Sequence, residues 1–182
     1  MQFTKEDARK KVLNCAKQYQ KKLLNKKLII IYRERRDNKI RYIEVVFHER
    51  NYQHLTGLEL IDKNGNVLHT VLMDITKITK ISGDYNGVRP YLFVDKLIGG
   101  VNFCLGLRQE EDVYVPSSAL LEDIKKLTIA PSQVLAILEK NISDTTYFTV
   151  KHVAKGLNLN NITLPDDISQ LICLDNYIYH KS

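Results

Sequence analysis

Hydrophobic positions recur at helical spacing near the N-terminus and then alternate along shorter stretches. Residues 4–25 have the helical period and begin at Thr4, a good N-cap, which predicts an amphipathic helix. Residues 28–33 are dense in β-branched side chains, and residues 40–48 alternate between apolar and polar positions, as strands do. The Asp37-Asn38 pair between them is typical of a turn. The pattern therefore predicts a β-hairpin after the helix.

The rest of the chain predicts more strands and one or two further helices. Strands are expected at residues 91–94, 100–107, 113–115 and 145–153, a helix is expected to start at Pro116-Ser117-Ser118, and residues 67–81 and 132–140 fit either element. The sum predicts an α+β fold, with the N-terminal helix packed on a mostly antiparallel sheet of about five to seven strands. We expect residues 1–156 to form this domain and residues 157–182 to pack on it as a C-terminal extension.

The cysteine spacing and the hydropathy of the chain indicate in which cellular compartment the protein is expected. The three cysteines, Cys15, Cys104 and Cys173, are far apart and lack metal-ligand spacing, so each is expected to be a small apolar core residue in a reducing cytoplasm. There is no run of about 18 apolar residues, and the N-terminus has no apolar leader. The sequence thus predicts neither a membrane span nor secretion, and places the protein in the cytoplasm of a host cell.

Positive charge is concentrated in the first 50 residues. The net charge is +6, and residues 1–50 hold 15 Lys and Arg against 6 Asp and Glu, whereas the remainder holds 12 against 15. Such a distribution favours a polyanionic partner, although a solvated helix face also carries lysines. The side chains expected to contact RNA lie on the helix and in the hairpin; they are Lys17, Lys21, Lys22, Arg33 and Arg41.

The familiar phosphate-loop, dinucleotide, zinc-protease and serine-hydrolase motifs are absent, so no metal or cofactor is predicted. RNA can be cleaved by protein side chains alone, because its own 2′-hydroxyl is the nucleophile. His54 is the predicted acid or base and Thr56 a donor to phosphate, while Lys151 and Tyr147 are predicted to hold the phosphate from the polar face of a strand. Ordinary structural roles remain open for these residues. His54 could cap a neighbouring carbonyl group within a connector, and Tyr147 and Lys151 could belong to a solvated strand face.

Three segments, in this order, resemble a known nuclease family. They are F-x-x-x-N-[aromatic]-x-H-L-T-G-[aliphatic] at residues 47–58, LGLRQEEDVYVPSSALLEDIKK at 105–126, and DTTYFTVKHVAKG at 144–156. Residues 8–156 resemble the fourth phage-type nuclease family of the barnase–EndoU–colicin–RelE superfamily. The resemblance implies a helix packed on an antiparallel sheet, metal-independent attack on RNA, and carriage by phages or conjugative elements. It assigns His54 and Thr56 to the site and matches Lys151 and His152 more loosely.

A narrower resemblance concerns small anti-CRISPR proteins of Gram-positive mobile elements. It implies an inhibitor of a type II CRISPR effector nuclease that acts on the guide RNA, by cleavage, truncation or blocked assembly. The partners would then be the effector and its guide RNA. Two alternatives stay open: a free-standing endoribonuclease toxin, and a non-catalytic inhibitor that binds RNA or protein.

Overall fold

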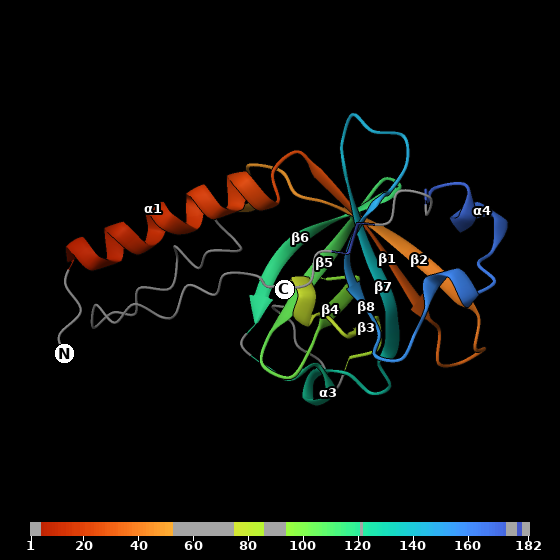
Figure 1. Cartoon of the computed structure of the whole chain (residues 1–182). Helices are drawn as coiled ribbons and strands as arrows, with labels where there is room; N and C mark the ends of the chain where they lie inside the picture. The colour runs from red at the N-terminus through yellow and green to blue at the C-terminus, as the bar shows by residue number, and fades with distance from the viewer. Residues whose placement is uncertain (1–4, 53–74, 86–93, 121, 174–177, 180–182) are drawn as a thin grey trace.

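The centre of the molecule is a closed β-barrel (Figure 1). A computed structural model describes residues 5–52, 75–85, 94–120, 122–173 and 178–179. The barrel strands are β1 (Lys26–Arg33), β2 (Ile40–Val46), β3 (Lys80–Ser82), β4 (Lys96–Gly99), β5 (Cys104–Glu110), β6 (Val113–Leu120) and β7 (Ser132–Asn141). The hairpin predicted from the N-terminal pattern is confirmed as β1 and β2, in antiparallel register with Ile30 opposite Ile43.

The barrel closes at β1, which pairs with β2 along one edge and with β7 along the other. Around the ring the order is β1-β2-β6-β5-β4-β3-β7. The β2–β6 pair is parallel, with Val45 opposite Tyr114, and the other barrel pairs are antiparallel. Strand β7 pairs with β3 near its start and, further along, with β8 (Thr149–Val153). Strand β9 (Ile178–Tyr179) then pairs with β8 in parallel.

Both faces of β1 are buried, which explains its continuous apolar run. Leu28 and Ile30 point into the barrel core, whereas Ile29 and Ile31 belong to a second cluster on the outer face. Residues beyond β8 cover that outer face, through Leu159 of η2 (Leu159–Asn161) and the single-turn helix α4 (Asp166–Ser169). All four β1 side chains are fully buried, and each contributes about 1.5–3 kcal/mol of apolar burial. A strand covered on both sides loses the polar alternation of a surface strand.

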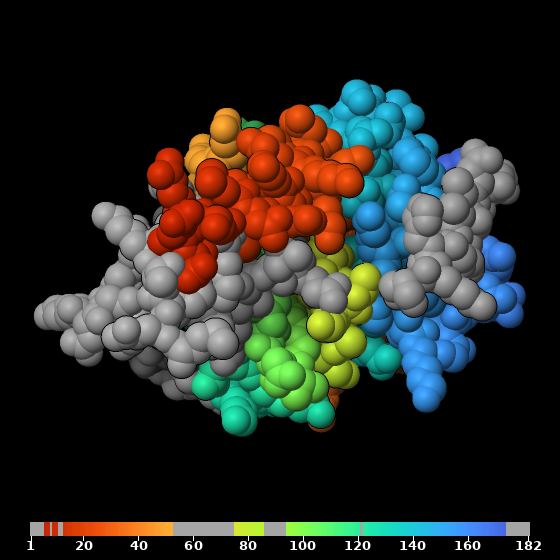
Figure 2. All heavy atoms as spheres, turned by 60° about the vertical axis from the view of Figure 1, so that its left-hand side comes forward, coloured from red at the N-terminus to blue at the C-terminus, as the bar shows by residue number. Residues whose placement is uncertain are grey.

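The predicted fold class is wrong: the molecule is mainly a closed β-barrel, and no open sheet carries the N-terminal helix. Helix α1 (Lys5–Lys22) extends away from the barrel in Figure 1 and forms a surface ridge in Figure 2. Among the side chains that the structure describes here, Tyr19 and Leu23 at the C-terminal end of the helical segment are buried in the core, while Leu13 further back is 53% exposed. The helix is therefore attached to the barrel at one end.

The local sequence predictions failed mainly in the second half. Pro116-Ser117-Ser118 does not start a helix, because these residues lie within β6. Helix α3 (Ile124–Leu127) begins later, where the carboxylate of Asp123 accepts a hydrogen bond of 2.9 Å from the Lys125 amide. Residues 132–140, which fitted either element, form most of β7, and the strand expected from residue 145 begins at Thr149.

Two of the three cysteines differ from the predicted core role. Cys104 is fully buried, and burial raises the pKa of its thiol to about 12. Cys15 and Cys173 are only half-buried. All three carry free thiols. The remaining small element, η1 (Ile75–Lys77), precedes β3 and places Ile75 in the barrel core.

Candidate functional site

The predicted catalytic pair, His54 and Thr56, lies outside the described residues, but the segment leading to it is described. Phe47 is buried in the core and Asn51 is 5% exposed. The Asn51 side chain accepts a 2.8 Å hydrogen bond from the His48 amide and donates one of 2.9 Å to the Pro116 carbonyl. The Tyr19 hydroxyl donates to the His48 carbonyl at 2.6 Å. The beginning of the motif is thus anchored to both α1 and β6.

Tyr147 and Lys151 do not share an open strand face. Tyr147 is fully buried, and its hydroxyl donates a 2.5 Å hydrogen bond to Glu44 Oε1. Burial, and then this hydrogen bond to Glu44, raises the pKa of Tyr147 far above its usual value. The phosphate-binding role remains a prediction for both residues, but Tyr147 would have to give up Glu44 to perform it.

Lys151 belongs to a cluster of lysines around two carboxylates. Lys151 Nζ lies 3.1 Å from Glu139 Oε2, which has no hydrogen-bond partner in the described part of the chain, so the contact is a charge pair. Lys26 Nζ lies 3.8 Å from the other Glu139 oxygen, and Lys27 Nζ lies 2.8 Å from Glu44 Oε2. Glu139 is only 6% exposed. These ammonium groups compensate the buried Glu139 and the half-buried Glu44, because a carboxylate removed from water needs an opposite charge nearby.

The residues predicted to contact RNA fall into two separate groups. Lys17, Lys21 and Lys22 are exposed on α1, which leads into the N-terminal end of β1. Arg33 closes the other end of β1, and Arg41 lies opposite Tyr32 on β2. Seven residue steps separate Lys26 from Arg33, or roughly 23 Å of strand. The exposed Arg41 is also paired with Asp37 at 2.6 Å, so part of its charge is compensated.

A polar pocket lies where β1 ends, and the sequence reasoning missed it. Its volume is about 150 Å³, and its walls come from β1, β3, β4 and β7 with the turns that follow them. The lining residues are Tyr32, Glu34, Arg36, Ile81, Ser82, Gly83, Asp84, Lys96, Ala130 and Ser132. Most of the polar residues lie at or just after strand ends. Polar residues at strand ends could have indicated the pocket from the sequence, but only if the pairing of the strands had been known.

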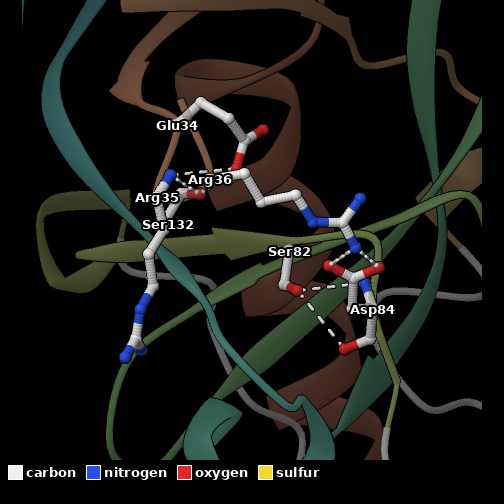
Figure 3. A network of polar contacts seen from close by, with 6 residues as sticks. All are labelled: Glu34, Arg35, Arg36, Ser82, Asp84 and Ser132. Atoms are coloured by element: carbon white, nitrogen blue, oxygen red, sulfur yellow. Dashed lines mark hydrogen bonds and ion pairs between the residues drawn. The ribbon is translucent and has the colours of Figure 1, made fainter. Parts of the chain in front are cut away.

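Hydrogen bonds hold the pocket walls in place (Figure 3). Glu34 Oε1 accepts from the Ser132 hydroxyl at 2.8 Å and from the Arg35 amide at 3.0 Å. Arg36 reaches across to Asp84, where Nη2 lies 2.8 and 2.9 Å from the two carboxylate oxygens. Tyr32 is 4% exposed, and burial, followed by the nearby Glu34 charge, raises its pKa to about 12. The pocket therefore combines carboxylate, guanidinium, ammonium and hydroxyl groups, and hydrogen bonds hold Glu34, Ser132, Arg36 and Asp84 in position.

A second ionic cluster lies beside the anchored turn. Glu110 pairs with Arg108 at 3.0 Å and with Arg50. The hydrogen bond from Arg108, and then the charges of both arginines, hold the pKa of Glu110 below its usual range. This cluster joins the tip of the β5–β6 hairpin to Arg50, within the first half of the motif. None of the helices that the structure describes is both long and apolar enough to span a membrane.

Comparison with protein families connects the N-terminal part of this structure to nucleases. Residues 11–82 match the family described as phage-Barnase-EndoU-ColicinE5/D-RelE like nuclease4. No curated protein and no solved structure matches the chain. The matched range contains most of α1, the β1–β2 hairpin, the HLTG motif, η1 and β3. It ends before the two later segments on which the resemblance also rested.

Proposed function

We propose, on the basis of the nuclease-family match over residues 11–82, that this chain is a nuclease-type domain that cleaves RNA without a metal ion. The match is the observation that carries the proposal. It covers most of α1, whose Lys17, Lys21 and Lys22 are exposed and suited to a phosphate backbone. It also covers His54 and Thr56, the pair assigned by the motif to proton transfer and phosphate contact.

The chemistry required of the protein is limited. The 2′-hydroxyl of RNA attacks the adjacent phosphate, so the protein must supply a base, a proton donor for the leaving oxygen, and positive charge around the phosphate. A histidine can take or give a proton near neutral pH. In this proposal His54 performs one proton transfer and Thr56 donates a hydrogen bond to a phosphate oxygen.

The finer proposal is that the RNA is the guide of a type II CRISPR effector and that the protein acts as an anti-CRISPR inhibitor. Its support is the resemblance to small anti-CRISPR proteins of Gram-positive mobile elements. Two other functions are distinguishable by experiment. A free-standing toxin would cleave RNA without an effector, and a non-catalytic inhibitor would block guide loading without cleavage.

The test is a denaturing gel of guide RNA labelled separately at its 5′ and 3′ ends. RNA is incubated with this protein, with the effector, or with both, each with EDTA, and His54→Ala is run beside the wild type. Shortening that needs both proteins and is abolished in His54→Ala supports the guide-RNA proposal. Cleavage by this protein alone supports the toxin. Intact RNA in every lane contradicts a nuclease activity, and guide loading onto the effector then tests the binding inhibitor.

A further inference from the structure

The pocket at the end of β1 contains two charged groups, Lys96 and Glu34, that form no ion pair with any residue in the described part of the chain. Arg36 and Asp84 neutralise each other across the pocket wall. Within the described ranges, Lys96 forms no ion pair, and Glu34 uses only Oε1, for the Ser132 hydroxyl and the Arg35 amide. The pocket therefore has a free ammonium group and a free carboxylate oxygen. A complementary ligand presents both an anionic oxygen and a hydrogen-bond donor.

The barrel holds these groups in place before any ligand arrives. Lys96 begins β4, and Ser132 begins β7, opposite Ile81 of β3. Glu34 follows β1 directly, and its own amide donates a 2.8 Å hydrogen bond to the Lys39 carbonyl. Because the strands fix these backbone positions and two hydrogen bonds hold Glu34 Oε1, binding requires little rearrangement of the backbone or of Glu34, which favours affinity.

The size and chemistry of the pocket limit the ligand class. A volume of about 150 Å³ suits part of one nucleotide, such as its phosphate and ribose, and is too small for a folded RNA element. Phosphate is the anion of an RNA chain, and ribose hydroxyls and base amino groups are its donors. A single ribonucleotide therefore presents both partners that Lys96 and Glu34 require.

We propose that this pocket is a subsite for one ribonucleotide of the RNA, with Lys96 on a phosphate oxygen and Glu34 Oε2 accepting a hydrogen bond from a ribose hydroxyl or base amino group. The assignment rests on the proposed action on RNA and specifies a further contact for it. The pocket is distinct from the anchored start of the motif. Val46 lies opposite Lys27 near the N-terminal end of β1, whereas Tyr32 and Glu34 lie at the other end.

The test measures binding of small probes and does not depend on cleavage. The four 3′-nucleoside monophosphates and inorganic phosphate are each titrated into the full ¹⁵N-labelled chain, and amide chemical shifts are followed by NMR. At least one mononucleotide is expected to shift the amides of Ser82, Gly83 and Ala130. Lys96→Met and Glu34→Gln should each weaken this binding tenfold or more. Glutamine keeps an oxygen for the Ser132 hydroxyl, so Glu34→Gln is the milder structural change.

The matched controls remove exposed charges outside the pocket. Lys155→Met and Glu111→Gln change the net charge as the test variants do, and they should leave the dissociation constant within twofold. Chemical-shift mapping on the wild-type chain answers the question even if a pocket variant fails to fold.

Any of four results would overturn the subsite, and the first three concern where and how tightly the probes bind. They are mononucleotide shifts that map elsewhere, equal weakening by the control variants, and inorganic phosphate binding as tightly as every mononucleotide. The absence of shifts with all five probes has the same consequence. Failure of the subsite is separable from failure of the proposed function. If guide RNA stays intact but a nucleotide binds the pocket, the nuclease proposal is wrong. If RNA is cleaved but no probe shifts the pocket amides, only the subsite proposal is wrong.

Discussion

Replacing Asn51 by alanine should destabilise the protein strongly, although Asn51 is polar and lies in a turn. Its side chain receives the His48 amide at 2.8 Å and donates to the Pro116 carbonyl at 2.9 Å. The residue is 5% exposed, so these two backbone groups have little access to water. Alanine removes both hydrogen bonds and offers no replacement for either partner.

The magnitude follows from those two hydrogen bonds. A hydrogen bond contributes about 1 kcal/mol net, and a buried group left without a partner costs about 1–3 kcal/mol. Removing both should lower the free energy of unfolding by about 2–4 kcal/mol, the lower figure applying if water enters the turn. A domain of this size is stable by about 5–15 kcal/mol, so the decrease is a large fraction. The melting temperature should fall by about 4–16 °C.

Urea denaturation followed by circular dichroism measures the change. The control is Asn102→Ala, which removes an exposed asparagine and should stay within about 0.5 kcal/mol of the wild type. An Asn51→Ala variant that also stays within that limit would refute the anchoring role. It would mean that the turn at the start of the motif is held by packing rather than by the Asn51 side chain.

Three further predictions concern the other groups of the site. Tyr147→Phe removes the hydrogen bond to Glu44 and should lower the free energy of unfolding, measured by urea denaturation, by about 1.5–3 kcal/mol. If the folded variant does not cleave RNA, this would support the predicted contact of Tyr147 with phosphate. Burial holds the pKa of His152 in the folded protein below its usual 6.5. The contribution of neutral His152 to the stability of the fold is therefore fully present above pH 6.5, and it is lost as the pH falls through the lower pKa of the folded state. His152→Gln should flatten this acid destabilisation in urea titrations at several pH values, and an unchanged pH profile would contradict it. The double variant Lys17→Glu with Lys21→Glu should make RNA binding less sensitive to salt. The slope of the logarithm of the binding constant against the logarithm of the salt concentration should fall in magnitude by about 0.7–0.9 for each phosphate that these lysines no longer neutralise. An unchanged slope in filter-binding assays would show that these two lysines do not contact the RNA backbone.

The β1–β2 hairpin could be predicted from the sequence because its pairing is local and its turn is short. The barrel could not be predicted in the same way. Its closure depends on β1 pairing with β7, which places Lys26 opposite Asn141, and hydrophobic periodicity carries no signal for partners so distant along the chain. The β6 strand was hidden as well, because Pro116 followed by two serines favours the start of a helix.

The burial of Tyr147 escaped prediction for a related reason. Alternation correctly indicates that neighbouring positions of a strand face opposite ways, but it does not indicate which face is covered. The segment beyond β8 covers the face expected to be open, and beneath it the Tyr147 hydroxyl donates to Glu44. A polar tip on a large side chain is compatible with burial when it finds a partner.

The motif itself divides into parts with different physical roles. Phe47 and Asn51 match its first half, and in the structure both anchor the chain: Phe47 fills the barrel core, and Asn51 bonds to the Pro116 carbonyl of β6. In this chain, the first half of the motif therefore attaches the segment that follows, whatever chemistry His54 and Thr56 perform. Substituting Asn51 should therefore impair RNA cleavage indirectly, through stability and position, whereas His54→Ala should impair it with the free energy of unfolding unchanged. Comparing the two variants at a temperature where both are folded separates the residues that attach the site from the residues that act in it.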